Sequence, residues 1–212
     1  REDRLAKGGS SWDEDAMSNL DLPKTKFTGY DYSQLEINAK VLAVFKDGAE
    51  VTELNEGDDA VVILDETPFY AESGGQVGDT GVITIGESRF AVTDTKKTAK
   101  GQYLHFGTVE MGGLGKGDSV TASVNVEKRY AIMRNHTAAH LLQAALRKVL
   151  GDHVHQAGSY VDAERCRFDF SHFEAVTHEQ LSEIEALVNK DIFDAIPVTM
   201  TAMPIEEAKK LG

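Results

Sequence analysis

The pattern of apolar residues changes at about residue 126, and the two parts that result must fold differently. Before this point, short apolar runs of strand length alternate with glycine-containing turns. After it, apolar residues recur with the period of a helix over residues 127–150. We therefore predict an α+β chain in which a small β-barrel precedes a long helix packed on antiparallel strands.

Short strands and turns dominate the first part of the chain. The pair Asp47-Gly48 follows an apolar run and indicates a hairpin, because glycine accepts the positive φ that such a turn requires. A second turn is expected at 86–88. The strands we predict are 41–45, 60–64, 82–85, 90–92, 104–109 and 120–126.

The second part begins with the long helix, which we expect to stop at Gly151. Thr177 and Gln180 form the pattern of a capping box and predict the start of a second helix. The remaining elements that we predict are strands at 155–161, 165–170 and 196–200, and a helix that begins at about 204.

These patterns divide the chain into three segments. Residues 1–26 are polar and are expected to be a linker, residues 27–126 the barrel domain, and residues 127–212 the α+β domain. The chain starts at Arg1 and stops where a helix is just beginning. We therefore expect a piece of a longer protein, truncated at the C-terminus of its second domain.

The net charge of the chain and its distribution limit the kinds of partner that the protein can bind. The net charge is −13, which argues against a protein that grips nucleic acid with its whole surface. Residues 1–126 carry 12 Lys+Arg and 22 Asp+Glu, whereas residues 127–212 carry 10 and 13, so any RNA contact should use the second part. Its basic residues also fit the solvated face of a helix, which charge alone favours; they include Lys128, Arg129, Arg134, Arg147 and Lys148.

Cys166 is the one cysteine, so the chain can form no disulfide within itself, which fits a reducing cytoplasm. No apolar run approaches the length that spans a bilayer. We expect a cytoplasmic protein without a membrane or DNA as its partner.

Two histidines stand four residues apart in His136-Thr137-Ala138-Ala139-His140. On a helix this spacing places both imidazoles on one face, where they can share a metal ion such as zinc. The pair alone is a weak signal, because a polar helix face gives the same spacing. Thr137 stands where a zinc protease of this pattern carries its general base, so peptide hydrolysis by that route is not expected.

A zinc site needs at least one more protein ligand than the pair supplies. Cys166 is an internal candidate, although it could equally be a small buried filler. His153, His155 and His172 are further options, and the spacing does not choose between them.

A long glycine-bearing segment, Thr67-Pro-Phe-Tyr-Ala-Glu-Ser-Gly-Gly-Gln-Val-Gly-Asp79, lies between predicted strands. We call residues 67–79 the glycine loop. Glycines let a ligand approach the backbone closely, so the loop is either part of a binding site or a long turn of the barrel.

Four segments together resemble the editing region of the alanyl-tRNA synthetases. The glycine loop resembles a glycine motif of that family, and Arg134-Asn-His-Thr-Ala-Ala-His-Leu-Leu142 resembles its first zinc motif. Gln156-Ala-Gly-Ser159 and Arg167-Phe-Asp-Phe-Ser-His172 follow at the family's spacing. The resemblance runs from about residue 27 to residue 212.

This resemblance implies a barrel joined to an α+β deacylase that hydrolyses tRNA(Ala) wrongly charged with serine or glycine. The parent enzyme ligates alanine to tRNA(Ala) with ATP and magnesium, in an aminoacylation domain that would lie before Arg1. A pocket for alanine cannot exclude glycine by size and rejects serine poorly, so a second, hydrolytic site supplies the missing discrimination.

The resemblance also assigns residues. His136 and His140 would bind zinc together with a Cys-x-x-x-His pair expected beyond Gly212, so zinc binding by this chain should be weak or absent. Gln156 would hydrogen-bond the substrate or the attacking water, unless it only caps a turn. Substrate contacts would come from Gly74, Gly75 and Thr137, with Ala139 as an alternative to Thr137.

Three other readings remain open from the sequence. One is a free-standing relative that edits the same tRNA in trans. Another is a tRNA-binding module without catalysis, which would keep its function after substitution of His136. The third is a structural spacer between catalytic and oligomerisation domains, for which neither RNA nor metal would matter. Oligomeric state and the preference between serine and glycine have no sequence signal.

Overall fold

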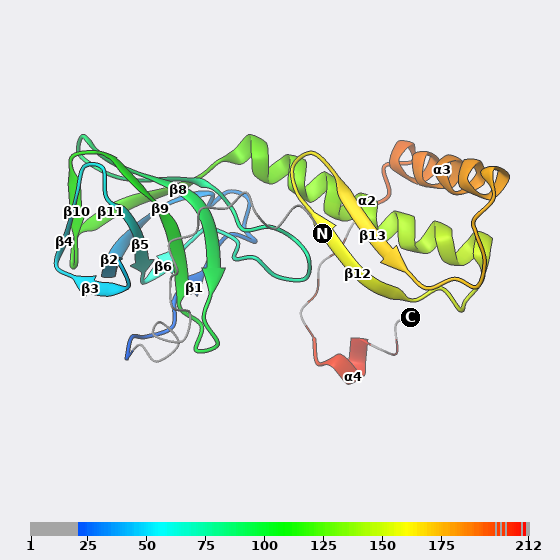
Figure 1. Cartoon of the computed structure of the whole chain (residues 1–212), viewed down its shortest axis with the longest axis horizontal. Coiled ribbons are helices and arrows are strands. Elements are labelled where there is room, and N and C mark those ends of the chain that lie inside the picture. Colours follow the sequence, from blue (N-terminus) through cyan, green and yellow to red (C-terminus); the bar gives the residue numbers. More distant parts are fainter. Residues whose placement is uncertain (1–20, 198, 200, 202, 209, 211–212) are drawn as a thin grey trace.

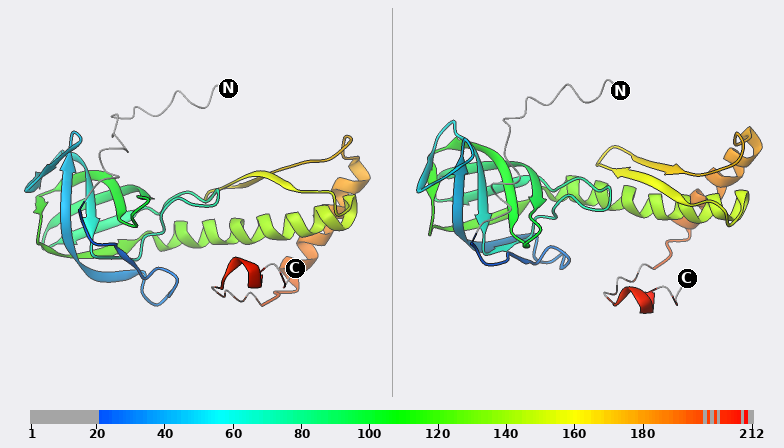
Figure 2. Two further views of the ribbon diagram at one scale, coloured as in Figure 1. Left: turned by 90° about the horizontal axis from the view of Figure 1, so that it is seen from below. Right: turned by 60° about the horizontal axis from the view of Figure 1, so that its bottom comes forward.

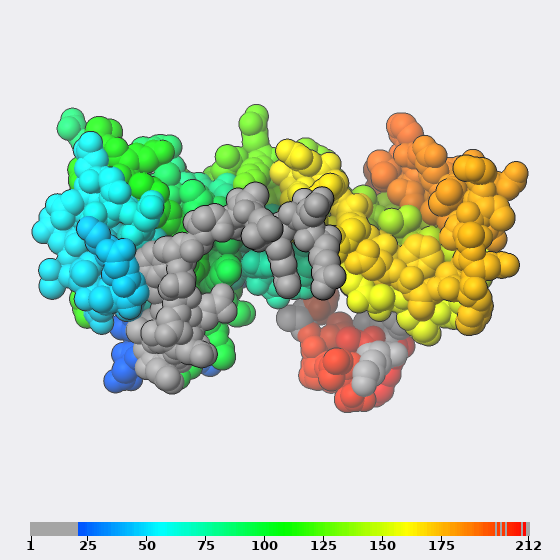
Figure 3. Space-filling view, viewed as in Figure 1, coloured from blue at the N-terminus to red at the C-terminus, as the bar shows by residue number. Residues whose placement is uncertain are grey.

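A computed structural model describes residues 21–197, 199, 201, 203–208 and 210. The described chain has two parts, a β-barrel and a long helix that carries a two-stranded sheet and a second helix (Figure 1). In the space-filling view these parts lie at opposite ends of an elongated molecule (Figure 3). This confirms the predicted α+β class.

Six antiparallel strands close the barrel. Their order is β11-β7-β8-β9-β5-β2, and pairing of β11 with β2 completes the ring. Strand β3 (Ala49–Val51) extends β2 through the Asp47-Gly48 turn, whose two residues have φ of 51° and 79°. The bounds of the six are β2 Glu36–Lys46, β5 Asp59–Leu64, β7 Gly81–Ile85, β8 Ser88–Lys97, β9 Tyr103–Met111 and β11 Ser119–Val124.

Alternating apolar residues of these strands fill the barrel, as the period of two along a strand requires. Val44, Val62, Phe90 and Val120 all lie in the main cluster and are at most 3% exposed. Four shorter strands form two further pairs outside the barrel sheet: β1 (Lys26–Phe27) with β6 (Glu66–Thr67), and β4 (Glu53–Asn55) with β10 (Gly113–Gly115).

Helix α2 (Val126–Leu150) leaves the barrel directly after β11. Asn125 caps its first turn, where the side chain accepts a hydrogen bond from the Lys128 amide at 3.0 Å. At the other end the Gly151 amide donates to the Arg147 carbonyl. The helix is 25 residues long, so one element extends from the barrel to the far end of the second part (Figure 2).

Strands β12 (Gln156–Val161) and β13 (Cys166–Phe170) form a hairpin that packs along α2. Helix α3 (His178–Phe193) packs against the distal half of α2 through a cluster that includes Leu146, Val154 and Ile184. The capping box of Thr177 and Gln180 is present, as predicted. A short helix, α4, spans Ile205–Ala208.

A second apolar cluster joins the glycine loop to the helix and the hairpin. It contains Ile132 and Ala139 of α2, Val161 of β12, Cys166 of β13 and Val77 of the loop. The loop therefore reaches from the barrel to the end of the hairpin (Figure 2).

Two predictions lie partly outside the described residues: the strand at 196–200 and the linker at 1–26. Of the former, residues 196, 197 and 199 are described and lie in no strand. Of the latter, Lys26 belongs to β1. None of the helices in the described residues combines the length and the apolar composition of a membrane-spanning segment.

Candidate functional site

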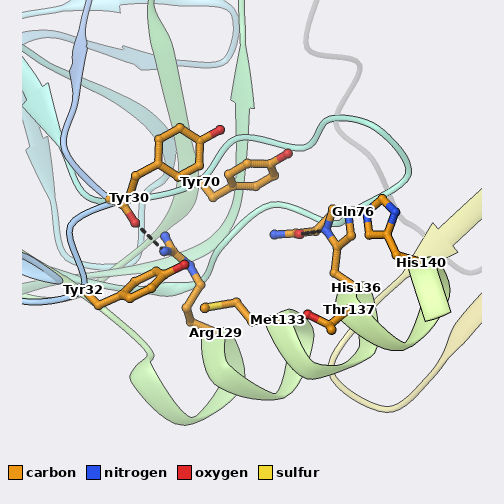
Figure 4. A pocket seen from close by; sticks show the side chains of 10 residues that line it. Tyr30, Tyr32, Tyr70, Gln76, Arg129, Met133, His136, Thr137 and His140 are labelled. Atoms are coloured by element: carbon orange, nitrogen blue, oxygen red, sulfur yellow. Dashed lines mark hydrogen bonds between the residues drawn. The ribbon is translucent and has the colours of Figure 1, made fainter. Parts of the chain in front are cut away.

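One face of α2 forms the floor of a cavity of about 500 Å³ between the barrel and the helix. Arg129, Met133, His136, Thr137 and His140 all line it (Figure 4). Their spacing keeps them on one side of the helix, because residues three and four apart lie above one another. The helix therefore aligns five side chains along a single cavity.

The two histidines lie side by side. Their ring centroids are 5.1 Å apart and their planes differ by 14°. His136 is half-buried, and this burial, followed by the proximity of His140, lowers the pKa of His136 below its usual value. Its ring is therefore neutral at pH 7, which is the form that binds a metal ion.

Gln76 of the glycine loop fixes the orientation of His136. The amide oxygen Oε1 accepts a hydrogen bond from Nδ1 of His136 at 2.6 Å, across 60 residues of sequence. Because an amide oxygen can only accept, Nδ1 carries the hydrogen and Nε2 keeps its lone pair. Gln76 is itself 5% exposed, so the contact is held within the fold.

The glycine loop is locked against the hairpin at its tip. Backbone hydrogen bonds join Val161 to Gly75 at 2.8 Å and Val77 to Val161 at 3.1 Å. A Cβ on Gly75 would lie 2.4 Å from the Ser159 hydroxyl and 2.5 Å from its carbonyl oxygen, so only glycine fits. Gly74 has φ of +60° and accepts from the Ser159 hydroxyl at 3.3 Å. Both glycines therefore position Gln76 rather than line the cavity themselves.

A buried ion pair joins α2 to the base of the glycine loop. The side chain of Arg129 is 4% exposed and that of Asp79 is 1% exposed, and Nε of Arg129 lies 2.8 Å from Oδ2 of Asp79. Arg129 also donates to the carbonyls of Gly29 and Pro68, each at 2.8 Å. The guanidinium thus ties together three segments that surround the cavity.

Three tyrosines gather at one end of the cavity, and the histidine pair lies at the other (Figure 4). Tyr30 and Tyr32 are 65% and 42% exposed, whereas Tyr70 is partly covered. Phe27 supports two of them, through edge contacts to Tyr30 at 5.0 Å and to Tyr70 at 6.3 Å. The cavity therefore has an aromatic end and an imidazole end.

The two histidines could supply two of the ligands of a zinc ion. Their rings lie close together, and the hydrogen bond from Nδ1 of His136 leaves the Nε2 lone pair of that ring available to the metal. Among the residues that the structure describes, no group of three or more His, Cys, Asp or Glu side chains is arranged so that it could hold a metal ion. Cys166 lies instead in the apolar cluster with Ile132 and Ala139. His153 and His172 contact each other at 2.8 Å beyond the far end of α2.

The other residues singled out from the sequence are placed as follows. Thr137 lines the cavity, whereas Ala139 is 7% exposed within the apolar cluster. Gln156 is exposed at the start of β12, beside a bulge at Gly158, and does not line the cavity. The structure thus brings His136, His140 and Thr137 together and leaves Gln156 apart.

The basic cluster is not uniform. Arg134, Arg147 and Lys148 are exposed and Lys128 is partly so, as a solvated face requires. Arg129 is not part of that face, because its charge is buried against Asp79. Including it among the solvated residues was wrong, and the reason is a partner that lies 50 positions earlier in the sequence.

Several residues at this site gave no signal in the sequence. Gln76 lies inside the recognised glycine loop but looks like any loop amide, and Tyr30 and Tyr32 lie in a short loop after β1. The Gly74-Gly75 pair is the one local signal for Gln76. Adjacent glycines indicate that another segment approaches the backbone closely, directly before Gln76.

Comparison with known proteins gives a consistent result. The family model described as class II (A) tRNA synthetases matches residues 1–128. An alanine-tRNA ligase of Acetivibrio thermocellus is 50% identical over 100% of this chain and 24% of its own length. Those of Neisseria meningitidis serogroup B and Bacillus velezensis are 50% and 49% identical over 98% and 89% of the chain, which cover 24% and 21% of their lengths. The chain therefore spans about a quarter of the relatives it matches.

Proposed function

The chain belongs to the alanyl-tRNA synthetase family, and on this basis we propose that it is the region that hydrolyses tRNA(Ala) wrongly charged with serine or glycine. The observation that carries the proposal is the histidine pair on the cavity, with His136 held by Gln76 so that Nε2 is bare. A histidine that donates through one ring nitrogen and keeps the other free toward a cavity has the arrangement typical of a metal ligand.

The substrate of such a reaction is an ester on the terminal ribose of the tRNA. The ester would lie at the imidazole end of the cavity, above His136 and His140. Thr137 lies next to both histidines on the cavity wall, and its hydroxyl can hydrogen-bond the side-chain hydroxyl of a serine ester. The contact expected for Gln156 stays a prediction.

Zinc held by His136 and His140 would supply Lewis acidity, either to activate water or to orient the ester carbonyl. The residues of the chain contribute the rest of the arrangement. Gln76 keeps Nδ1 of His136 protonated, the helix keeps both rings on one face, and the glycine loop keeps Gln76 in place. In the proposed site, a cysteine and a histidine would complete the zinc shell as two further ligands.

The same proposal places the chain in a cytoplasmic synthetase. ATP and magnesium would act in a separate aminoacylation domain, and the partner would be tRNA(Ala). The exposed residues Arg134, Arg147 and Lys148 offer positive charge for phosphates on the α2 side of the molecule.

Accumulation of seryl-tRNA(Ala) tests the proposal. The complete synthetase is incubated with ATP, serine and tRNA(Ala), as wild type, as His136→Ala and as the control His178→Ala, an exposed histidine at the start of α3. We expect seryl-tRNA(Ala) to accumulate only with His136→Ala, while the rate of alanine attachment is the same in all three. Equal, low levels in all three enzymes would contradict a deacylase role and favour a tRNA-binding module.

A further inference from the structure

The proposed hydrolysis at His136 and His140 leaves the aromatic end of the cavity without a role. Tyr30 and Tyr32 expose large aromatic surfaces, and the partly covered Tyr70 lies beside them. A purely structural loop would be expected to bury such rings, because the removal of apolar surface from water stabilises the fold. Large aromatic rings left exposed in a cavity therefore indicate a binding surface.

The loop that carries these tyrosines is held firmly. Its start is paired through β1 with β6, and the Gly29 carbonyl accepts from Arg129 at 2.8 Å. A Cβ on Gly29 would lie 2.1 Å from the Pro68 carbonyl oxygen, so the loop packs tightly on the start of the glycine loop. Asp31 closes the turn by accepting from the Ser33 amide at 3.0 Å. The rings are therefore presented on a preorganised backbone.

Arg129 couples this loop to the histidine pair. It lies on the same face of α2 as His136, and its guanidinium contacts both Gly29 and Asp79. Met133 lies between them on the cavity floor and adds an apolar surface. The positions of the tyrosines and of the histidines are thus set by one rigid helix (Figure 4).

We propose that Tyr30, Tyr32 and Tyr70 form a stacking site for the base of the terminal nucleotide of the tRNA. The proposal rests on the function proposed above, in which the scissile ester lies at His136 and His140. The base and the ester are attached to the same ribose, so a ligand with its ester at one end of the cavity must place its base nearby. Aromatic side chains bind an unpaired base through its face, with little dependence on its identity.

This assignment gives each end of the cavity a separate task. The imidazole end acts on the ester, and the aromatic end holds the nucleoside that is common to every tRNA. Loss of stacking should therefore weaken substrate binding and leave the hydrolytic step itself almost unchanged.

The test uses the complete synthetase and tRNA(Ala) in which the terminal adenine is replaced by 2-aminopurine, a fluorescent base that is quenched when it stacks. Four variants are compared with wild type: Tyr32→Leu, the double variant Tyr30→Leu/Tyr32→Leu, the conservative Tyr32→Phe, and Tyr130→Leu. Tyr130 is a matched control, because it is 40% exposed on α2 but does not line the cavity.

We expect binding to quench 2-aminopurine in wild type, Tyr32→Phe and Tyr130→Leu, and to quench it much less in the leucine variants of Tyr30 and Tyr32. With seryl-tRNA(Ala), the double variant should raise KM for hydrolysis on the order of tenfold, with kcat nearly unchanged. Equal quenching and equal KM in the double variant and in wild type would overturn the stacking site.

The outcomes separate this inference from the function on which it rests. Quenching that depends on the tyrosines, without any hydrolysis that depends on His136, would support base stacking and contradict the deacylase. Hydrolysis that depends on His136, without any effect of the tyrosines, would support the deacylase and overturn the stacking site.

Discussion

Gln76 Oε1 accepts a hydrogen bond from Nδ1 of His136 at 2.6 Å, although the two residues are 60 positions apart and belong to different parts of the molecule. This contact connects the barrel's glycine loop to the helix that carries the proposed zinc ligands. It makes the geometry of the histidine pair depend on the barrel, so neither part forms the site alone.

The first prediction concerns this contact. Gln76→Ala should remove the acceptor for Nδ1 and let His136 change tautomer, which should weaken zinc binding and deacylation by about 10- to 100-fold. Zinc affinity is measured by chelator competition on the complete synthetase, with Gln143→Ala on α2 as a control for loss of an amide elsewhere. Unchanged zinc affinity in Gln76→Ala would show that the hydrogen bond does not orient the ligand.

The second prediction concerns Arg129 and Asp79. Arg129→Met should lower the free energy of unfolding by about 3–5 kcal/mol, because it leaves a buried carboxylate without a counter-ion. The double variant Arg129→Met/Asp79→Asn should recover part of this loss, since the amide can still accept from the Tyr70 backbone. Denaturant unfolding measures the free energy of unfolding of both variants. If the loss in the double variant equals the sum of the losses from the two single substitutions, Arg129 and Asp79 are not a coupled pair.

The third prediction compares two adjacent glycines. Both have positive φ, so alanine at either position carries a backbone cost of about 1–2 kcal/mol. Gly75→Ala should also push the glycine loop away from Ser159, whereas no atom lies within 4 Å of a Cβ on Gly74. We expect Gly75→Ala to lose far more stability and deacylation than Gly74→Ala, and similar losses would remove the packing argument.

The fourth prediction concerns His105, which lies fully buried in the barrel. Its Nδ1 donates to the Val62 carbonyl at 2.8 Å and its Nε2 accepts from the Thr67 hydroxyl at 2.7 Å, just where the glycine loop begins. Burial lowers the pKa of His105 from 6.5 to about 4, and the Val62 contact opposes this only in part. The folded protein therefore keeps this ring neutral at a pH where the unfolded chain binds a proton.

The sign of the resulting pH effect follows from this lowered pKa. The contribution of neutral His105 to stability is complete above about pH 6.5 and is lost as the pH falls toward 4, by about 3 kcal/mol in all. Denaturant unfolding between pH 7.5 and 4 should show a smaller decrease in His105→Gln than in wild type. Identical pH dependence in the two proteins would contradict a neutral, buried ring.

The barrel and the helices were predictable because their signals are local. The apolar runs of β5 and β9 have the length of a strand and can be recognised directly in the sequence. Thr177 and Gln180 form their capping box within one helical turn. By contrast, the pairs β1–β6 and β4–β10 contain two or three residues each, too few to show a period.

The site was predictable only in part, for the same reason. His136 and His140 follow a helical spacing that can be read directly, whereas Gln76, Arg129 and Tyr30 act through contacts far apart in sequence. The sequence predicts a solvated Arg129, since nothing near it in the chain reveals that its charge is paired. Long-range polar contacts of this kind become visible only in the folded structure.

Single-turnover hydrolysis of preformed seryl-tRNA(Ala) tests the central claim most directly. The complete, zinc-loaded synthetase is compared as wild type, His136→Ala and His178→Ala, with tRNA binding measured in parallel. We predict rapid release of serine by wild type and His178→Ala, and release near the uncatalysed rate by His136→Ala with binding retained. Equal rates for wild type and His136→Ala, or no release by the wild-type enzyme, would contradict a deacylase centred on His136 and His140.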